Sequence, residues 1–103
     1  MTDNLRDSAL RQAAACAREK YAGEEKRIER GLLLALNNKV ALPSWTGSET
    51  SLVQSDSDKT VFYNVVRQHC DCPDFGNAPD GRCKHRWAVH FAAIAELSIR
   101  MAG

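Results

Sequence analysis

Apolar residues recur at helical spacing through the N-terminal part of the chain. Two segments carry this pattern, residues 3–21 and 24–37, and polar residues occupy their opposite faces. Apolar side chains three and four positions apart share one face of an α-helix, so the pattern predicts two amphipathic helices. The apolar positions are Leu10, Ala14, Ala17 and Tyr21 in the first segment and Ile28, Leu32, Ala35 and Leu36 in the second. Gly23 leaves their continuity open, because a glycine inside a helix costs only about 1 kcal/mol, while Asn37-Asn38 is a C-cap signal.

The hydrophobic period becomes shorter after the second predicted helix. Val40 and Leu42 alternate, and Trp45 begins a segment with the character of an edge strand. Residues 51–55 and 60–67 then alternate in the manner of strands, with the turn-forming sequence Asp-Ser-Asp-Lys between them. This arrangement predicts a β-hairpin.

Two further apolar patterns lie in the second strand of the hairpin and near the C-terminal end of the sequence. The second strand of the hairpin carries Val61, Tyr63 and Val65 on one face and Phe62, Asn64 and Val66 on the other. We expect this strand to run directly into Cys70, with proline and glycine turns in the loop that follows. A final helix is predicted from about residue 85 to 101, with its apolar side chains in the core. These side chains are Trp87, Phe91, Ile94 and Leu97.

The order of these elements predicts an α+β fold. A small hairpin or short sheet is followed by a C-terminal helix and preceded by one or two N-terminal helices. At 103 residues the chain corresponds to one domain with a modest core. Fourteen basic residues against thirteen acidic ones argue against a globally basic nucleic-acid binder. No secretory leader or membrane-spanning run is recognisable, so a cytoplasmic or nuclear location is expected.

The most informative polar feature is a dense cluster of cysteine and histidine. It reads Cys70-Asp-Cys72, then ten residues, then Cys83-Lys-His85. Residues i and i+2 of an extended segment point to the same face, so each pair can present both side chains to one ion. Two thiolates on one zinc ion lie about 3.8 Å apart, given Zn–S bonds of about 2.3 Å. Four protein ligands leave no position for water, so the spacing predicts one structural Zn²⁺.

Other interpretations of these residues explain less. A disulfide within the first cysteine pair would be strained and needs an oxidising compartment, which nothing in the sequence indicates. A Cys/His nucleophile pair does not account for three clustered cysteines. His69 and His90 lie close enough in sequence to compete with His85 as the fourth ligand, although the spacing favours His85. The isolated Cys16 is interpreted as a small apolar residue of the first helix.

This arrangement resembles the SWIM zinc finger. The chain has a strand, the sequence C-D-C-P-D-F, a loop, the sequence C-K-H and an apolar helix, and the match covers about residues 45–95. The resemblance implies a hairpin and a helix around one zinc ion, with residues 43–103 forming the finger and residues 1–42 a helical extension packed on it. It also implies a binding function, toward DNA or another protein. The ligands that the resemblance implies are Cys70, Cys72, Cys83 and His85.

Two binding functions follow from these features. The first is a nucleic-acid-binding accessory module within a larger complex, because basic side chains gather around the ligand pairs and can contact phosphates. These residues are Arg67, Arg82, Lys84 and Arg86. The same cations can instead offset the net charge of −1 that three thiolates leave on Zn²⁺. The second function is a protein-interaction adaptor or homodimer that uses the apolar N-terminal helices, with the zinc purely structural.

Enzymatic activity is not expected. The sequence offers no phosphate-binding glycine loop, no convergent acid–base pair and no open metal site, so we expect no small-molecule substrate. Glu24, Glu25 and Glu29 lie among basic residues of the second predicted helix, and we interpret them as members of a solvated face.

Overall fold

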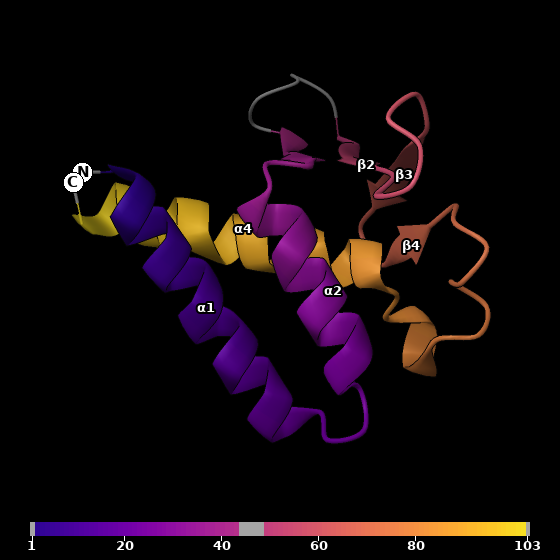
Figure 1. Cartoon of the computed structure of the whole chain (residues 1–103), viewed down its shortest axis with the longest axis horizontal. Helices are drawn as coiled ribbons and strands as arrows, with labels where there is room; N and C mark the ends of the chain where they lie inside the picture. Colours follow the sequence, from indigo (N-terminus) through magenta and orange to yellow (C-terminus); the bar gives the residue numbers. More distant parts are fainter. Residues whose placement is uncertain (1, 44–48, 103) are drawn as a thin grey trace.

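The computed structural model describes residues 2–43 and 49–102, and it confirms the predicted α+β fold. Trp45 and the segment predicted around it lie outside the described residues. The elements in chain order are α1 (Thr2–Lys20), α2 (Glu25–Leu36), β1 (Val40–Ala41), β2 (Ser51–Gln54), β3 (Phe62–Val66), β4 (His69–Cys70), the 3₁₀ turn η1 (Pro79–Gly81) and α4 (Lys84–Ala102). The helices α1 and α2 form a hairpin that lies across α4, and the sheet lies toward the beginning of α4 (Figure 1).

The two N-terminal helices are separate. Gly23 lies between them with φ of +96°, a left-handed conformation that suits glycine and ends the helical path. The predicted C-cap of α2 is confirmed: Asn38 has φ of +58°, and its N–H donates to the carbonyl oxygen of Ala35 (3.2 Å). The next N–H, of Lys39, donates to the carbonyl oxygen of Leu34 (2.9 Å), which completes a Schellman motif. The chain therefore leaves α2 directly into β1.

The four strands form one antiparallel sheet in the order β1-β2-β3-β4. The predicted hairpin is confirmed as β2 and β3, with Val53 opposite Tyr63. The prediction that the second strand continues into Cys70 is wrong. The strand ends at Val66, and Arg67 turns the chain with φ of +55° so that β4 pairs back on β3. Cys70 thus lies opposite a β3 residue instead of beyond the end of that strand.

Buried side chains form two clusters that share α4. The helical core consists of Leu10, Ala14, Ala17, Ile28, Leu32, Ala35, Trp87, Phe91 and Ala95. The sheet core consists of Leu34, Val40, Leu42, Val53, Val65, Cys70, Cys72, Ala78, Cys83, Ala88 and Ala92. The strand β1 falls within residues 1–42, yet it pairs with β2 of the predicted finger. The division into an extension and a finger stays a prediction. The helical core and the sheet core both contain side chains of α4.

The contact between α2 and α4 is unusually close. A methyl group at Gly31 would come within 2.6 Å of Cβ of Trp87 and 2.9 Å of the carbonyl oxygen of Lys84. Only glycine at this position lets the backbone of α2 lie against the first turn of α4, so this contact fixes the part of α4 that carries His85.

The prediction for the apolar stripe of α4 is right for two residues and wrong for two. Trp87 and Phe91 are buried in the helical core. Ile94 is 36% exposed and Leu97 is 58% exposed. The buried side of α4 continues instead through three alanines of the two cores, Ala88, Ala92 and Ala95.

Candidate metal centre

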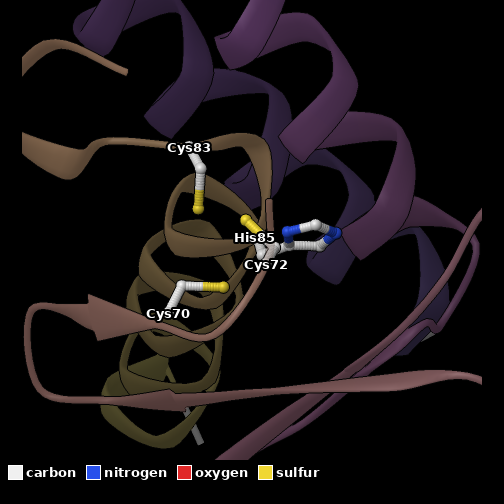
Figure 2. A group of neighbouring side chains, drawn as sticks. All are labelled: Cys70, Cys72, Cys83 and His85. Atoms are coloured by element: carbon white, nitrogen blue, oxygen red, sulfur yellow. The ribbon is translucent and has the colours of Figure 1, made fainter. Parts of the chain in front are cut away.

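The four predicted ligands come together in the structure. Cys70 lies in β4, Cys72 follows that strand, Cys83 immediately precedes α4, and His85 lies in its first turn. All four side chains are buried, and their ligand atoms lie within 4.8 Å of one another. Figure 2 shows the three sulfur atoms and the imidazole ring converging on one point between the strand and the helix. The remaining cysteine, Cys16, is exposed on α1 and lies outside this group.

The first ligand pair is oriented by the residue between its members. The carboxylate of Asp71 accepts hydrogen bonds from the backbone N–H (2.9 Å) and the side-chain amide (2.8 Å) of Asn64 in β3. These bonds hold Asp71 outward on the exposed side of the sheet. Because adjacent residues of extended backbone point to opposite faces, Cys70 and Cys72 point inward together.

The second ligand pair is oriented by the start of α4. The carbonyl oxygen of Cys83 accepts the first helical hydrogen bond, from the N–H of Trp87 (3.1 Å), so Cys83 is the N-cap residue. The N–H of Arg86 donates a hydrogen bond to the Cys83 sulfur, as an N-cap side chain commonly accepts from the third helical residue. His85 is then carried on the first turn of the helix toward the cysteine pair.

The ionisation of the thiols differs across the group. The hydrogen bond from the Cys70 thiol, supported by the N–H of Arg86, outweighs the effect of burial and lowers the pKa of Cys83 to about 4. The hydrogen bond to Cys83, together with burial, raises the pKa of Cys70. Burial raises the pKa of Cys72. Metal binding would release protons from the thiols whose pKa is raised.

The imidazole of His85 has an unmet polar requirement. The side chain is 3% exposed, and outside the ligand group neither Nδ1 nor Nε2 has a hydrogen-bond partner among the described residues. Burying a polar group without a partner costs free energy, so a partner at the centre of the cysteine group is expected. The ring of Tyr63 packs against the imidazole with centroids 4.5 Å apart and limits its rotation. A metal ion bound to one nitrogen would remove part of this cost.

The two competing histidines lie elsewhere. His69 packs against Phe75, with ring centroids 4.7 Å apart. His90 packs edge-on against Trp87 on the side of α4 that faces α1, and burial lowers its pKa. The structure thus groups His85, and neither of these residues, with the three cysteines. Three sulfur ligands and one nitrogen, all buried, can bind one metal ion in a closed sphere.

Most of the basic residues predicted to contact nucleic acid have partners within the chain. The ammonium group of Lys84 lies 3.0 Å from the carboxylate of Asp56. The guanidinium of Arg86 donates to the carbonyl oxygen of Asp80 (2.8 Å). Arg67 is exposed in the turn between β3 and β4. The fourth residue, Arg82, is engaged more extensively.

Arg82 forms an ion pair with Glu24, a residue whose predicted exposure to solvent is wrong. Glu24 was expected on a solvated face, but it is only 7% exposed. Its carboxylate accepts two hydrogen bonds from Arg82 (3.0 and 2.7 Å), and these bonds raise the pKa of the guanidinium. Arg82 also donates to Asp80 (3.1 Å) and lies 4.5 Å from the ring centroid of Tyr21.

A second ion pair that the sequence pattern does not predict lies near the metal centre. Arg27 of α2 donates two hydrogen bonds, of 2.9 and 3.0 Å, to the carboxylate of Asp74, which holds the pKa of Asp74 below its usual range. The partners lie 47 positions apart here and 58 positions apart for Glu24 and Arg82. No local sequence signal identifies such pairs.

No helix in the described ranges has the length and apolar character needed to cross a membrane. Comparison of the chain with models of protein families, with curated proteins and with solved structures gives no match.

Proposed function

We propose that the protein is a small binding module whose sheet core is stabilised by one structural zinc ion. The observation that carries this proposal is the group of four buried ligand atoms within 4.8 Å of one another. Its imidazole nitrogens have no other partner among the described residues. Bound zinc would link β4, the following loop and the start of α4.

The same arrangement supports a SWIM-type assignment. A hairpin leads to the C-x-C pair, and the C-x-H pair opens an apolar helix, which is the order that the family resemblance implies. Four protein ligands would leave no coordination position for a substrate or water, so we propose a binding function instead of catalysis. Reduced thiolates held on zinc fit a cytoplasmic or nuclear location.

Native mass spectrometry of protein purified without added metal tests the zinc proposal. We expect one zinc ion per chain, and we expect a chelator to remove it together with the native charge-state distribution. The reason is that structural zinc sites supply about 10–16 kcal/mol of apparent binding free energy at neutral pH. A folded chain that carries no metal would contradict the proposal.

A basic cleft on the surface favours contact with a nucleic-acid backbone as the binding function. A cleft of about 340 Å³ between α2 and the start of α4 is lined by four basic residues and one acidic residue. These are Lys26, Arg27, Arg30, Lys84 and Asp74. Because Arg27 and Lys84 have carboxylate partners, we propose that Lys26 and Arg30 make the phosphate contacts. Among the four basic residues predicted from the sequence to contact nucleic acid, Arg67 is the exposed one, and it lies in the turn between β3 and β4.

A salt series with single-stranded and duplex DNA tests this contact. Each phosphate contact on duplex DNA contributes a slope of about −0.9 to log K against log salt concentration, so the double variant Lys26→Ala/Arg30→Ala should lose a slope of about 2. The matched control is Arg11→Ala/Lys59→Ala, which removes the same charge from exposed positions outside the cleft. Equal slopes for the two double variants would contradict the assignment of the cleft.

The adaptor alternative is favoured by a different surface. The buried faces of α1 and α2 are occupied by the helical core, whereas Leu97 and Met101 of α4 are 58% and 80% exposed. A protein partner or second copy would therefore use the C-terminal part of α4 together with the exposed Leu5 of α1. Association through these side chains would be nearly independent of salt, in contrast to phosphate binding.

A further inference from the structure

Two ion pairs connect α2 and its N-cap residue, Glu24, to the loop between the ligand pairs. We call residues 73–82 the metal-binding loop, and we call the pairs Arg27–Asp74 and Glu24–Arg82 the loop ion pairs. Each is bidentate, with two N–H groups of the guanidinium on two carboxylate oxygens at 2.7–3.0 Å. Bidentate pairing of arginine with a carboxylate restricts orientation as well as distance. The loop is therefore held near its beginning and at its end.

The loop ion pairs lie next to the ligands in the chain. Asp74 follows Cys72 by two residues, and Arg82 immediately precedes Cys83. The loop also contributes Ala78 to the sheet core, Phe75 packs against that core and against His69 of β4, and the carbonyl oxygen of Asp80 accepts a hydrogen bond from Arg86 of α4. The loop ion pairs thus connect the chain beside two of the four ligands to a helix distant in sequence.

The burial of Glu24 indicates that its pairing is specific. A carboxylate that is 7% exposed carries a desolvation cost unless a cation is held against it. Arg82 provides that cation, and its guanidinium packs on Tyr21 at the end of α1. Buried ion pairs add little net stability, but removal of one partner is costly, so their main effect is to favour one arrangement of the chain.

We propose that Glu24 and Arg27 are positioning residues of the metal centre. They hold the metal-binding loop so that Cys72 and Cys83 face each other before the ion arrives, which raises metal affinity because less ordering is required on binding. This inference rests on the proposed zinc-binding function. It also makes α2 part of the metal-binding unit.

Competition with a chromophoric chelator measures the zinc affinity of each variant. Glu24→Gln and Arg27→Gln should each weaken zinc binding by about 10–100-fold, the range found when groups that orient metal ligands are removed. Arg27→Asp should weaken it as well, and Arg27→Asp/Asp74→Arg should restore it by re-forming the pair in reverse. If Glu24→Gln fails to fold, Arg27→Gln decides the matter, since that pair is partly exposed.

Two controls separate positioning from general effects. Glu29→Gln removes a carboxylate from the same helix, but its partner is Arg18 of α1 at 3.4 Å, so zinc affinity should not change. Leu10→Ala lowers stability within the helical core, away from the loop, and should also leave the affinity unchanged. Zinc binding in Glu24→Gln and Arg27→Gln equal to the unmodified chain, or a loss in Leu10→Ala as large as theirs, would overturn the inference. An unmodified chain that binds no zinc would instead overturn the proposed function.

Discussion

Serine in place of Cys83 is expected to abolish tight zinc binding and to unfold the sheet core while the helical core stays folded. Cys83 is fully buried, and its thiol is the one of the three whose pKa is lowered. A serine hydroxyl does not supply a thiolate. Because structural zinc contributes about 10–16 kcal/mol and a small domain is stable by only about 5–15 kcal/mol, the sheet core should not survive the loss of this ligand.

The helical core should survive because it contains none of the four ligands. Amide hydrogen exchange tests this division directly. We expect amides of β2, β3 and β4 to lose protection in the variant, and amides of α1, α2 and the middle of α4 to keep it.

The matched control for this prediction is Cys16→Ser. It makes the same chemical change at an exposed cysteine outside the ligand group, so zinc content and exchange should equal those of the unmodified chain. A Cys83→Ser protein that retains one zinc ion and native protection throughout the sheet would show that Cys83 is not a ligand.

Alanine in place of Phe91 is expected to lower the free energy of unfolding by about 3–5 kcal/mol, the usual range for removal of a buried aromatic ring. Phe91 is fully buried and stacks on Trp87, with ring centroids 5.5 Å apart. Its loss would leave a cavity where α1, α2 and α4 meet. Urea unfolding followed by circular dichroism in excess zinc measures the change.

Leu97→Ala is the matched control on the same helix. Leu97 is 58% exposed, and leucine and alanine have similar helix propensities, so this change should stay within about 0.5 kcal/mol. Comparable losses for the two variants would mean that the buried side of α4 has been assigned wrongly.

The helices and the ligand group could be predicted because their signals are local. Helical spacing over 24–37 identifies α2 to within a residue at each end. The ligand group follows from the i, i+2 spacing of two short segments, one at the end of the sheet and one at the start of a helix. In both cases the residues that form the sequence pattern are the ones that make the contacts: the apolar residues pack in the core, and the cysteines and histidine form the ligand group.

The errors arise where the structure depends on contacts between distant segments. Ile94 and Leu97 are larger than the alanines of α4 and were assigned to the core on hydrophobicity. The rotation of α4 about its axis, which the close contact with Gly31 of α2 helps to fix, instead turns Ala88, Ala92 and Ala95 inward. The turn at Arg67 was missed because the chain reverses there with a left-handed residue that is neither glycine nor asparagine.

Burial of Glu24 could not be predicted for a related reason. A glutamate among lysines and arginines on a helix has the local pattern of a solvated face, and only its partner distinguishes it. That partner, Arg82, is brought to it by the metal-binding loop. The residues that orient a site are therefore harder to identify from sequence than the ligands themselves.

Zinc K-edge X-ray absorption on protein purified without added metal tests the central claim most directly. The account predicts about three sulfur neighbours near 2.3 Å and one nitrogen neighbour near 2.0–2.1 Å, with no oxygen from water, as a closed structural site requires. These neighbours correspond to Cys70, Cys72, Cys83 and His85. A shell with fewer than three sulfur atoms, a shell containing oxygen, or a sample without zinc would contradict it.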